Sequence, residues 1–249
     1  MYPTPEENVV IHAAEKLMKD TMSRYDPSHD AYHVERVRKT ALQLAKTHPA
    51  EKKPDLFVVE LAALLHDVLD KKYVSSEQYS DPYNFFFPFF QDAASAGGVD
   101  LVTDGRAKTI TKIIENVSWS TEKKLVAQGK IDDWHRGCIE LHCVQDADRL
   151  DAIGAFGMLF GGKSIQFTQP LVVQGILRCA AYSAVTNHAL HTPPGDPAHE
   201  SSAIQHFHDK LLHIRERLKT EEGKRLAEKR HKLMCDFLDA IEKEYDVQA

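Results

Sequence analysis

Hydrophobic residues recur at helical spacing along most of the chain. Apolar positions three and four residues apart run from Val9 to Met18 and again from Val34 to Ala45. The segment 56–70 follows closely after a proline and is apolar on nearly all sides, which is typical of a helix in the centre of a domain. Because no stretch alternates with period two for long, the pattern predicts an all-α fold.

Four more segments carry the helical period: 103–117, 138–160, 170–190 and 203–245. Thr103 is the candidate N-cap of the first of these helices. Gly223 predicts a break or bend in the last, because glycine destabilises a helix interior. Two remaining segments are predicted to be irregular, namely 71–88 and 191–199.

An aromatic cluster at 83–90 contains five phenylalanines and is interrupted by Pro88. So many aromatic side chains do not suit an exposed loop. We therefore expect most of them to be buried, with one or two near a pocket mouth or a subunit contact. The sequence leaves open whether the cluster packs on the core, covers the pocket or joins the subunits of a homodimer.

The composition is that of an ordinary soluble globular protein, with 43% hydrophobic and 27% charged residues. A formal net charge of -6 disfavours duplex nucleic acid as a partner, whereas a small phosphorylated molecule can still bind near one cation. The first residues lack the basic and apolar parts of a signal peptide, and no stretch approaches about 18 apolar residues. We therefore expect a cytoplasmic protein, with a nuclear location left open, no membrane span and four reduced cysteines.

Imidazole and carboxylate groups interrupt the apolar pattern at three places. These are His33, the adjacent His66 and Asp67, and Asp148 with Asp146 beside it. An unpaired carboxylate in such surroundings would carry a large desolvation penalty. A divalent cation bound by two imidazoles and two carboxylates removes that penalty, and Mn2+, Mg2+, Co2+, Fe2+, Ni2+ and Zn2+ all suit such a site.

The order of these residues resembles a known family. The local sequences are HDAYHVERV at 29–37, AALLHDV at 62–68 and QDADRLDAIGA at 145–155. Together they resemble the HD superfamily of metal-dependent phosphohydrolases, and are most similar to its single-domain branch of bacterial nucleotide pyrophosphohydrolases. The resemblance extends from about residue 5 to 245, including the C-terminal helical segment.

This resemblance implies an all-α HD-domain helical bundle, forming one compact domain of roughly ten helices over 1–249. The metal-site helices would lie within about 28–160, and C-terminal helices within about 170–246 would pack on them. The family pattern implies one divalent ion, for which we favour Mn2+, and four ligands: His33, His66, Asp67 and Asp148. The aromatic stretch at about 74–90 is longer than in the family and leaves the choice of substrate open.

Asp146 and Asp148 compete for the last ligand position. They lie two residues apart, so a regular helix turns them about 200° away from each other. Asp148 shares its face with apolar and small residues, which would let the helix approach an ion closely. Asp146 shares its face with Arg149, a candidate ion-pair partner. We therefore favour Asp148 as the ligand and keep Asp146 as the alternative.

The remaining candidates surround this ligand set. Asp70 lies one turn after His66 and is the candidate general acid or base for the attacking water, with Asp67 as a second catalytic carboxylate. Three basic residues are candidates for binding substrate phosphate, with surface ion pairs as the alternative: Arg36, Arg149 and Lys210. Two more residues are expected beside the ligands, where they could orient a ligand or a water: His29 and Asp151.

Metal-assisted hydrolysis of a small phosphorylated substrate is therefore the expected activity. By resemblance, the leading substrates are nucleoside or deoxynucleoside triphosphates, cleaved to monophosphate and pyrophosphate. The alternatives are a 5′-nucleotidase, a cyclic-nucleotide phosphodiesterase, a hydrolase of hyperphosphorylated guanosine, or an HD module that senses a nucleotide without hydrolysing it. Some HD proteins are oxygenases with two irons, which are expected to have further histidine ligands between the HD pair and the last aspartate. The absence of histidine from 68–134 favours a site for one metal.

Overall fold

The computed structural model describes residues 2–23, 31–69, 74–153, 189, 192, 196 and 202–246. Over these residues the chain forms eleven α-helices and two 3-10 helices, and no strand. The all-α class is therefore confirmed. The chain divides into two compact units, Met1–Asp148 and Arg149–Ala249, and each is described by itself. The predicted helix at 170–190 lies outside the described residues.

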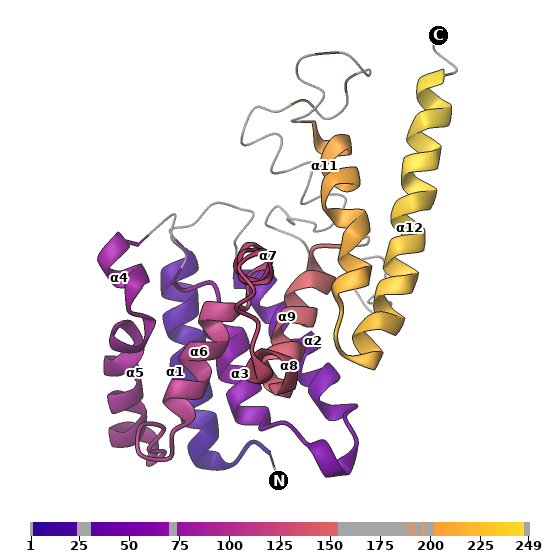
Figure 1. Cartoon of the computed structure of the whole chain (residues 1–249). Coiled ribbons are helices and arrows are strands. Elements are labelled where there is room, and N and C mark those ends of the chain that lie inside the picture. The colour runs from indigo at the N-terminus through magenta and orange to yellow at the C-terminus, as the bar shows by residue number, and fades with distance from the viewer. Residues whose placement is uncertain are drawn as a thin grey trace, which may run out of the picture. The chain divides into compact units, whose positions relative to one another are not determined.

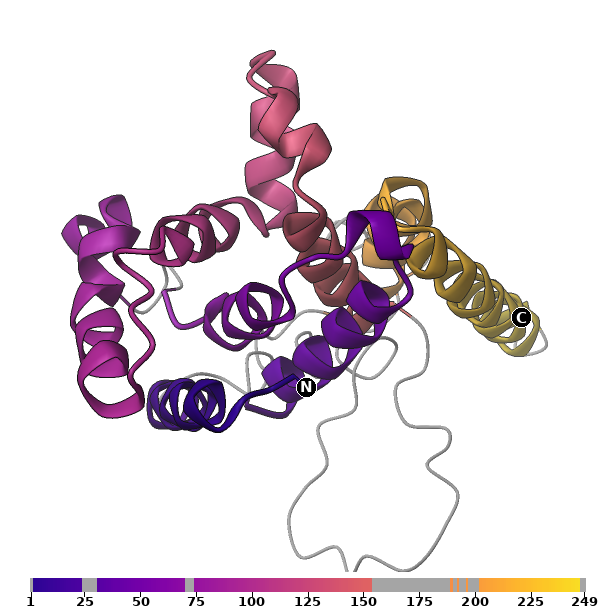
Figure 2. The same cartoon turned by 90° about the horizontal axis from the view of Figure 1, so that it is seen from below.

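Helix α3 (Leu56–Leu65) lies in the middle of the first unit. It packs against α1 (Pro5–Met22), α2 (Ala31–Lys46) and α6 (Arg106–Asn116), which surround it in Figures 1 and 2. Every side chain of α3 from Phe57 onward is buried, as its nearly unbroken apolar sequence predicts. The predicted central position of this helix is thus confirmed.

The ends of these helices are fixed by caps that the sequence encodes. Thr4 accepts from the backbone of Glu7 while the Glu7 side chain accepts from Thr4, which makes a capping box at the start of α1. The Asp55 side chain accepts from two backbone N–H groups at the start of α3. A short 3-10 helix, η1 (Ala50–Lys52), lies in the connection between α2 and α3.

The predicted irregular stretch up to Pro88 is wrong over its described part, because it contains two helices. These are α4 (Ser76–Ser80) and α5 (Pro82–Gly97), the second capped by Asp81 and with Pro88 in its interior. The Pro88 ring removes one backbone donor, but α5 packs along α1 and α6, and this packing outweighs the local cost.

The aromatic cluster is less deeply buried than expected. Phe86 and Phe90 are 1% and 0% exposed, so they belong to the core. Phe85, Phe87 and Phe89 are only partly covered within the first unit. The expectation that most of the five are buried is therefore wrong, since α5 is a surface helix with one inward face.

Three helices complete the path from α6 to Asp148, the last of the four candidate ligands. They are α7 (Trp119–Ala127), α8 (Asp133–Gly137) and α9 (Ile139–Asp151), of which α9 crosses the boundary between the two units. The N-cap of α6 is Gly105 and not the expected Thr103. Thr103 instead lies in a turn where its backbone N–H donates to the Asp100 side chain.

In the second unit, α11 (Ala203–Asp209), the 3-10 helix η3 (Leu211–Arg217) and α12 (Glu221–Asp246) follow one another. Gly223 lies inside α12, so the predicted break at that residue is wrong. The chain changes direction just before it, where Leu218 is extended and the Thr220 hydroxyl accepts from the Gly223 backbone.

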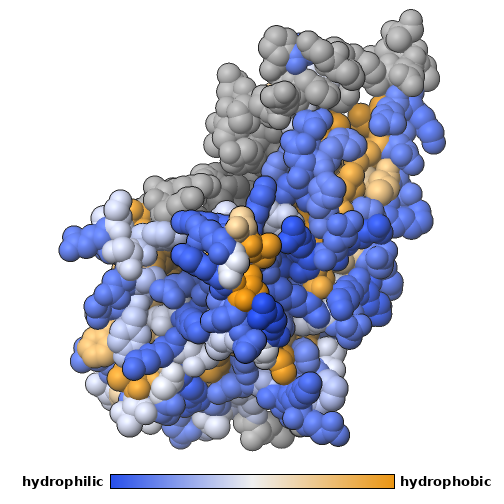
Figure 3. All heavy atoms as spheres, in the orientation of Figure 1, coloured by the Kyte–Doolittle hydropathy of each residue, from blue (hydrophilic) through white to orange (hydrophobic). Residues whose placement is uncertain are grey.

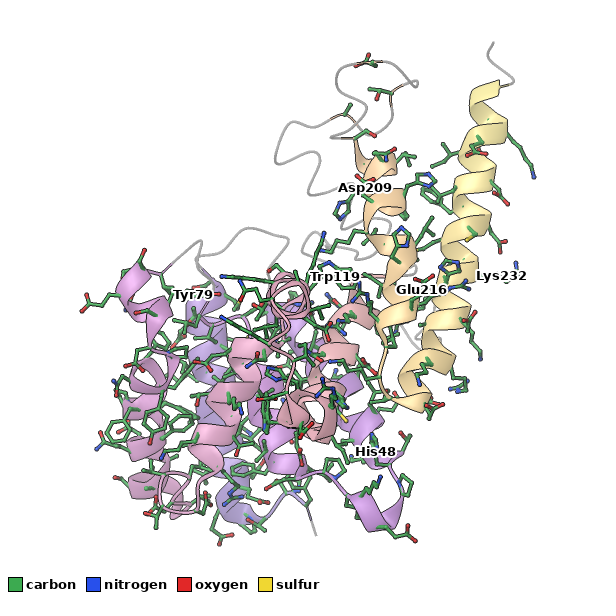
Figure 4. All side chains as sticks on the ribbon, in the orientation of Figure 1. His48, Tyr79, Trp119, Asp209, Glu216 and Lys232 are labelled. Atoms are coloured by element: carbon green, nitrogen blue, oxygen red, sulfur yellow. The ribbon has the colours of Figure 1, made fainter. Side chains whose placement is uncertain are left out.

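Figure 3 shows hydrophobic residues between α11 and α12, where the Phe207 and Phe237 rings lie 5.9 Å apart. Lys232 projects from the outer side of α12, as labelled in Figure 4, and pairs with Asp236 at 2.6 Å. This arrangement is that of an amphipathic surface helix. Among the described residues, no helix is both long and apolar enough to cross a membrane.

Candidate metal centre

His33 enters the site from the inner face of α2. The apolar face of this helix, which includes Val34, Val37 and Ala41, is fully buried in the first unit. His33 lies next to this face and is only 1% exposed. A buried imidazole requires a polar partner.

His66 and Asp67 follow directly on the last residue of α3. The helix ends at Leu65, and the chain continues in a turn in which Val68 donates to the Leu65 carbonyl. The expectation that this pair lies inside a continuous helix is therefore wrong. Ending the helix here places the side chains at its carboxyl end, where they meet groups from other helices.

The His66 ring is oriented by its own helix. Its Nδ1 lies 2.8 Å from the Ala63 carbonyl oxygen, which can only accept, so Nδ1 carries a proton and donates. The other nitrogen, Nε2, then points away from α3 towards the carboxylates. This is the usual arrangement of a metal-binding histidine, in which a backbone carbonyl fixes the ring and its tautomer.

Four polar atoms from three parts of the fold meet at this point. The Asp67 Oδ2 atom lies 3.3 Å from His33 Nε2 and 3.4 Å from His66 Nε2. The Asp148 Oδ1 atom lies 3.5 Å and 4.0 Å from the same two nitrogens. The ligand atoms of His33, His66 and Asp148 all lie within 4.8 Å of one another.

These separations fit a single first-row metal ion. Ligands at about 2.1 Å from an ion lie about 3.0 Å apart at a right angle and about 4.2 Å apart when opposite. The four carboxylate–imidazole separations, 3.3 to 4.0 Å, lie between these limits. His66 Nε2 is also buried and, among the described residues, accepts or donates no hydrogen bond. A cation between these atoms would satisfy both the imidazoles and the carboxylates, so the residues present fit a divalent metal.

Asp148 and Asp146 have different surroundings in the structure. Asp148 is partly exposed at the site, with 27% of its side chain accessible, whereas Asp146 is 0% exposed. Asp146 faces Cys143: burial, and then the charge of Asp146, raise the pKa of that thiol to about 12. The two carboxylates thus point in different directions, as their spacing on a helix predicts. The geometry favours Asp148 as the ligand, and this role remains a prediction.

The other candidate residues are spread over both units. Arg36 is half-buried on α2, one turn after His33. Arg149 is 2% exposed and donates through Nη1 to the Arg217 carbonyl at 2.9 Å, a packing contact of the second unit. Lys210 is the half-buried C-cap residue that follows α11, and both Asp70 and His29 lie outside the described residues.

Asp151 is buried in the second unit, 7% exposed. Its charge acts on Arg230, whose pKa is lowered by burial and raised in part by Asp151. Asp151 therefore has a cationic neighbour within the second unit. The expected role of Asp151 beside the metal ligands stays a prediction.

The histidines between the HD pair and Asp148 are engaged with each other. His142 Nε2 lies 2.8 Å from the His135 carbonyl oxygen. The His135 ring lies 2.5 Å from Asp132 and 3.1 Å from the Asn116 side-chain oxygen. These contacts give both imidazoles partners away from the metal ligands, which supports a site for one metal.

One buried charge near the site was not identified from the sequence. Glu60 is 3% exposed in the middle of α3 and is the only charged residue between 56 and 65. Such an isolated charge in an apolar helix requires a partner, which is the signal that could have revealed it. Its partner is Arg38 on α2.

Comparison with known proteins gives one curated relative and several solved structures. No protein-family model matches the chain. It is similar to YpgQ of Bacillus subtilis, described as uncharacterized, with 32% identity over 221 residues that cover 87% of this chain and 84% of YpgQ.

The structures agree with this relationship. The crystal structure of B. subtilis YpgQ in complex with ADP matches with a TM-score of 0.63 and 25% identity, covering 96% of each chain. An HD-superfamily hydrolase from Bacillus thuringiensis matches with a TM-score of 0.63 and 25% identity, covering 96% of this chain and 98% of that one.

Proposed function

The chain belongs to the family of YpgQ, a family of HD-domain phosphohydrolases, and on this premise we propose that it hydrolyses nucleotides with the help of one divalent metal ion. The proposed substrates are nucleoside or deoxynucleoside triphosphates, and the proposed products are a nucleoside monophosphate and pyrophosphate. The observation that carries this proposal is that one carboxylate oxygen of Asp67 and one of Asp148 each lie within 4.0 Å of the Nε2 atoms of both His33 and His66.

The metal ligands in this proposal are His33, His66, Asp67 and Asp148. When bound, a divalent cation supplies Lewis-acid chemistry, because it lowers the pKa of a water and polarises a phosphoryl oxygen. The protein supplies the orientation: the Ala63 carbonyl holds the His66 ring, and buried α2 holds His33. Mn2+ is the favoured ion, and Mg2+, Co2+, Fe2+, Ni2+ and Zn2+ also suit mixed nitrogen and oxygen ligands.

The reaction breaks the bond between the α-phosphorus and the oxygen that bridges to the β-phosphorus. The hydroxyl of a water is added to the α-phosphorus, and pyrophosphate leaves and takes up a proton. Asp70 is the proposed carrier of that proton, with Asp67 as the second carboxylate. Arg36 is the favoured phosphate-binding residue, because it lies one turn from His33 in the same unit. Arg149 and Lys210 are weaker candidates, and Arg149 already donates to the Arg217 backbone.

A nucleotide is the favoured ligand because a relative has been crystallised with one. YpgQ binds ADP in its crystal structure, and the present chain matches that structure over 96% of its length. The choice of a triphosphate and of pyrophosphate as product comes from the resemblance of the motifs.

The test is a turnover screen followed by phosphorus NMR. Purified protein with added Mn2+ is incubated with nucleoside and deoxynucleoside triphosphates, with monophosphates and with cyclic nucleotides. We expect triphosphates to give pyrophosphate directly, without stepwise release of inorganic phosphate. His66→Ala should abolish turnover.

The matched control is His12→Ala. His12 also places its Nδ1 near a backbone carbonyl of its own helix, that of Asn8 at 2.6 Å, but it is exposed on α1. This variant should keep full activity. Turnover of monophosphates alone would replace the proposal with a nucleotidase, and equal activity of the two variants would remove the metal site from the mechanism.

A further inference from the structure

Arg38 lies where three helices of the first unit meet. Its guanidinium pairs with Glu15 on α1 and with Glu60 on α3, and its Nε donates to Glu60 at 2.6 Å. Glu35 on α2 lies 3.5 Å from the same guanidinium. A single side chain thus ties α2, which carries His33, to α3, whose last residue, Leu65, directly precedes His66.

The partner on α3 is deeply buried. Glu60 is 3% exposed, and it also accepts a hydrogen bond from the Tyr2 hydroxyl. Burial, and then this bond to Glu60, raise the pKa of Tyr2, so the hydroxyl stays protonated and remains a donor. Paired, buried and directional contacts of this kind specify one arrangement of two helices more sharply than apolar packing does.

The pairs Arg38–Glu60 and His33–His66 occur in opposite order along the two segments. Arg38 follows His33 by five residues, whereas Glu60 precedes His66 by six. The helices are therefore antiparallel, and the ion pair lies about 7.5 Å along α2 from His33. A shift of α2 along α3 would therefore have two effects at once. It would break the Arg38–Glu60 pair, and it would move His33 Nε2 away from His66 Nε2.

We propose that Arg38 is a positioning residue, which fixes the register of α2 against α3 and so holds the His33 and His66 nitrogens at the separation that one metal ion requires. This inference rests on the proposed function, because it assigns Arg38 a purpose at the metal site. Lysine cannot replace it fully, since one ammonium group lacks the planar fork that contacts Glu15 and Glu60 together.

The experiment measures Mn2+ binding to chelator-treated protein by calorimetry, and thermal unfolding with and without Mn2+. The main variant is the double substitution Arg38→Met with Glu60→Leu. It removes both charges, so that no carboxylate is left buried without its partner and the fold is kept. We expect unchanged circular dichroism, a metal-free Tm near that of the wild type, and Mn2+ binding about tenfold weaker.

Two further variants keep the test decisive. Arg38→Lys retains the charge and should weaken Mn2+ binding by a smaller factor, about threefold. Arg136→Met removes an exposed arginine that pairs with Asp133 at 3.2 Å, and should bind Mn2+ as the wild type does. In the Arg38 variants, excess Mn2+ should restore most of the turnover while the metal-free Tm stays near the wild-type value, which a general loss of stability would instead lower.

The results separate this inference from the proposed function. If the wild type binds Mn2+ and the double and lysine variants bind it equally well, Arg38 has no positioning role and the metal site stands. If the wild type binds none of the candidate divalent ions, the proposed function fails and the positioning role fails with it.

Discussion

Replacing Asp148 and Asp146 by asparagine should give two different kinds of defect. Asp148 places a carboxylate oxygen 3.5 Å and 4.0 Å from the two imidazole nitrogens, whereas Asp146 is fully buried beside Cys143. Asp148→Asn therefore removes a negative charge from the metal site at little cost to the metal-free fold. Asp146→Asn disturbs a buried group without touching the ion.

The size of each effect follows from linkage. A metal present at 1,000 times its dissociation constant raises the free energy of unfolding by about 4.1 kcal/mol. Because each kcal/mol moves the Tm of a protein of this size by about 2 to 4 °C, wild-type protein should gain about 8 to 16 °C. Loss of a charged ligand should weaken binding at least 100-fold, or about 2.7 kcal/mol, and reduce the gain to about 3 to 6 °C.

Asp146→Asn should instead change the Tm of the metal-free protein. Disturbing a fully buried polar group costs about 1 to 3 kcal/mol, so the metal-free Tm should fall while the gain on adding Mn2+ stays at the wild-type value. Differential scanning fluorimetry with and without Mn2+ measures both numbers for each variant. If Asp146→Asn loses the gain and Asp148→Asn keeps it, the ligand assignment is wrong and the role passes to Asp146.

Two more expectations concern the first unit. Phe90→Ala should lower the free energy of unfolding, measured with urea, by about 3 to 5 kcal/mol, because the Phe90 ring is 0% exposed. Phe89→Ala should lower it clearly less, because the Phe89 ring is only partly covered. Equal losses of stability in the two variants would contradict the packing of α5. Burial raises the pKa of the Cys143 thiol to about 12. Below pH 9, iodoacetamide should therefore label half-buried Cys235 in the native protein well before it labels Cys143, as measured by peptide mass spectrometry. Equally fast labelling of the two cysteines would contradict the burial of Cys143.

The central helix and the candidate ligands could be identified from the sequence because both depend on strong local signals. Nearly every position of 56–65 is apolar, so only a buried helix suits it. His33, His66 and Asp148 stand out because polar groups interrupt apolar helices, and the structure brings them together. The prediction that these residues lie together also required the family resemblance, because spacing along the chain does not fix how helices pack.

The errors arose where a local signal competes with packing or capping. Pro88 predicted an irregular segment, yet α5 continues through it because its aromatic face is buried against neighbouring helices. Gly223 predicted a break, yet the Thr220 cap starts α12 before it. The end of α3 at Leu65 was missed because the apolar sequence continues past it, although the helix does not.

The Arg38–Glu60 pair could not be predicted because its two members lie 22 residues apart on different helices. Glu60 alone signals a buried charge, but many arginines and lysines in the sequence could have paired with it. Only the antiparallel packing of α2 and α3 selects Arg38.

The most direct test of the central claim is the metal content of the protein. Protein purified without chelator, then saturated with Mn2+ and dialysed, is measured by elemental analysis beside His66→Ala and the exposed control His12→Ala. We expect about one divalent ion per chain in the wild type and the control, and none in His66→Ala. A wild-type protein that holds no divalent ion, and whose turnover is unchanged by chelator, would contradict the account.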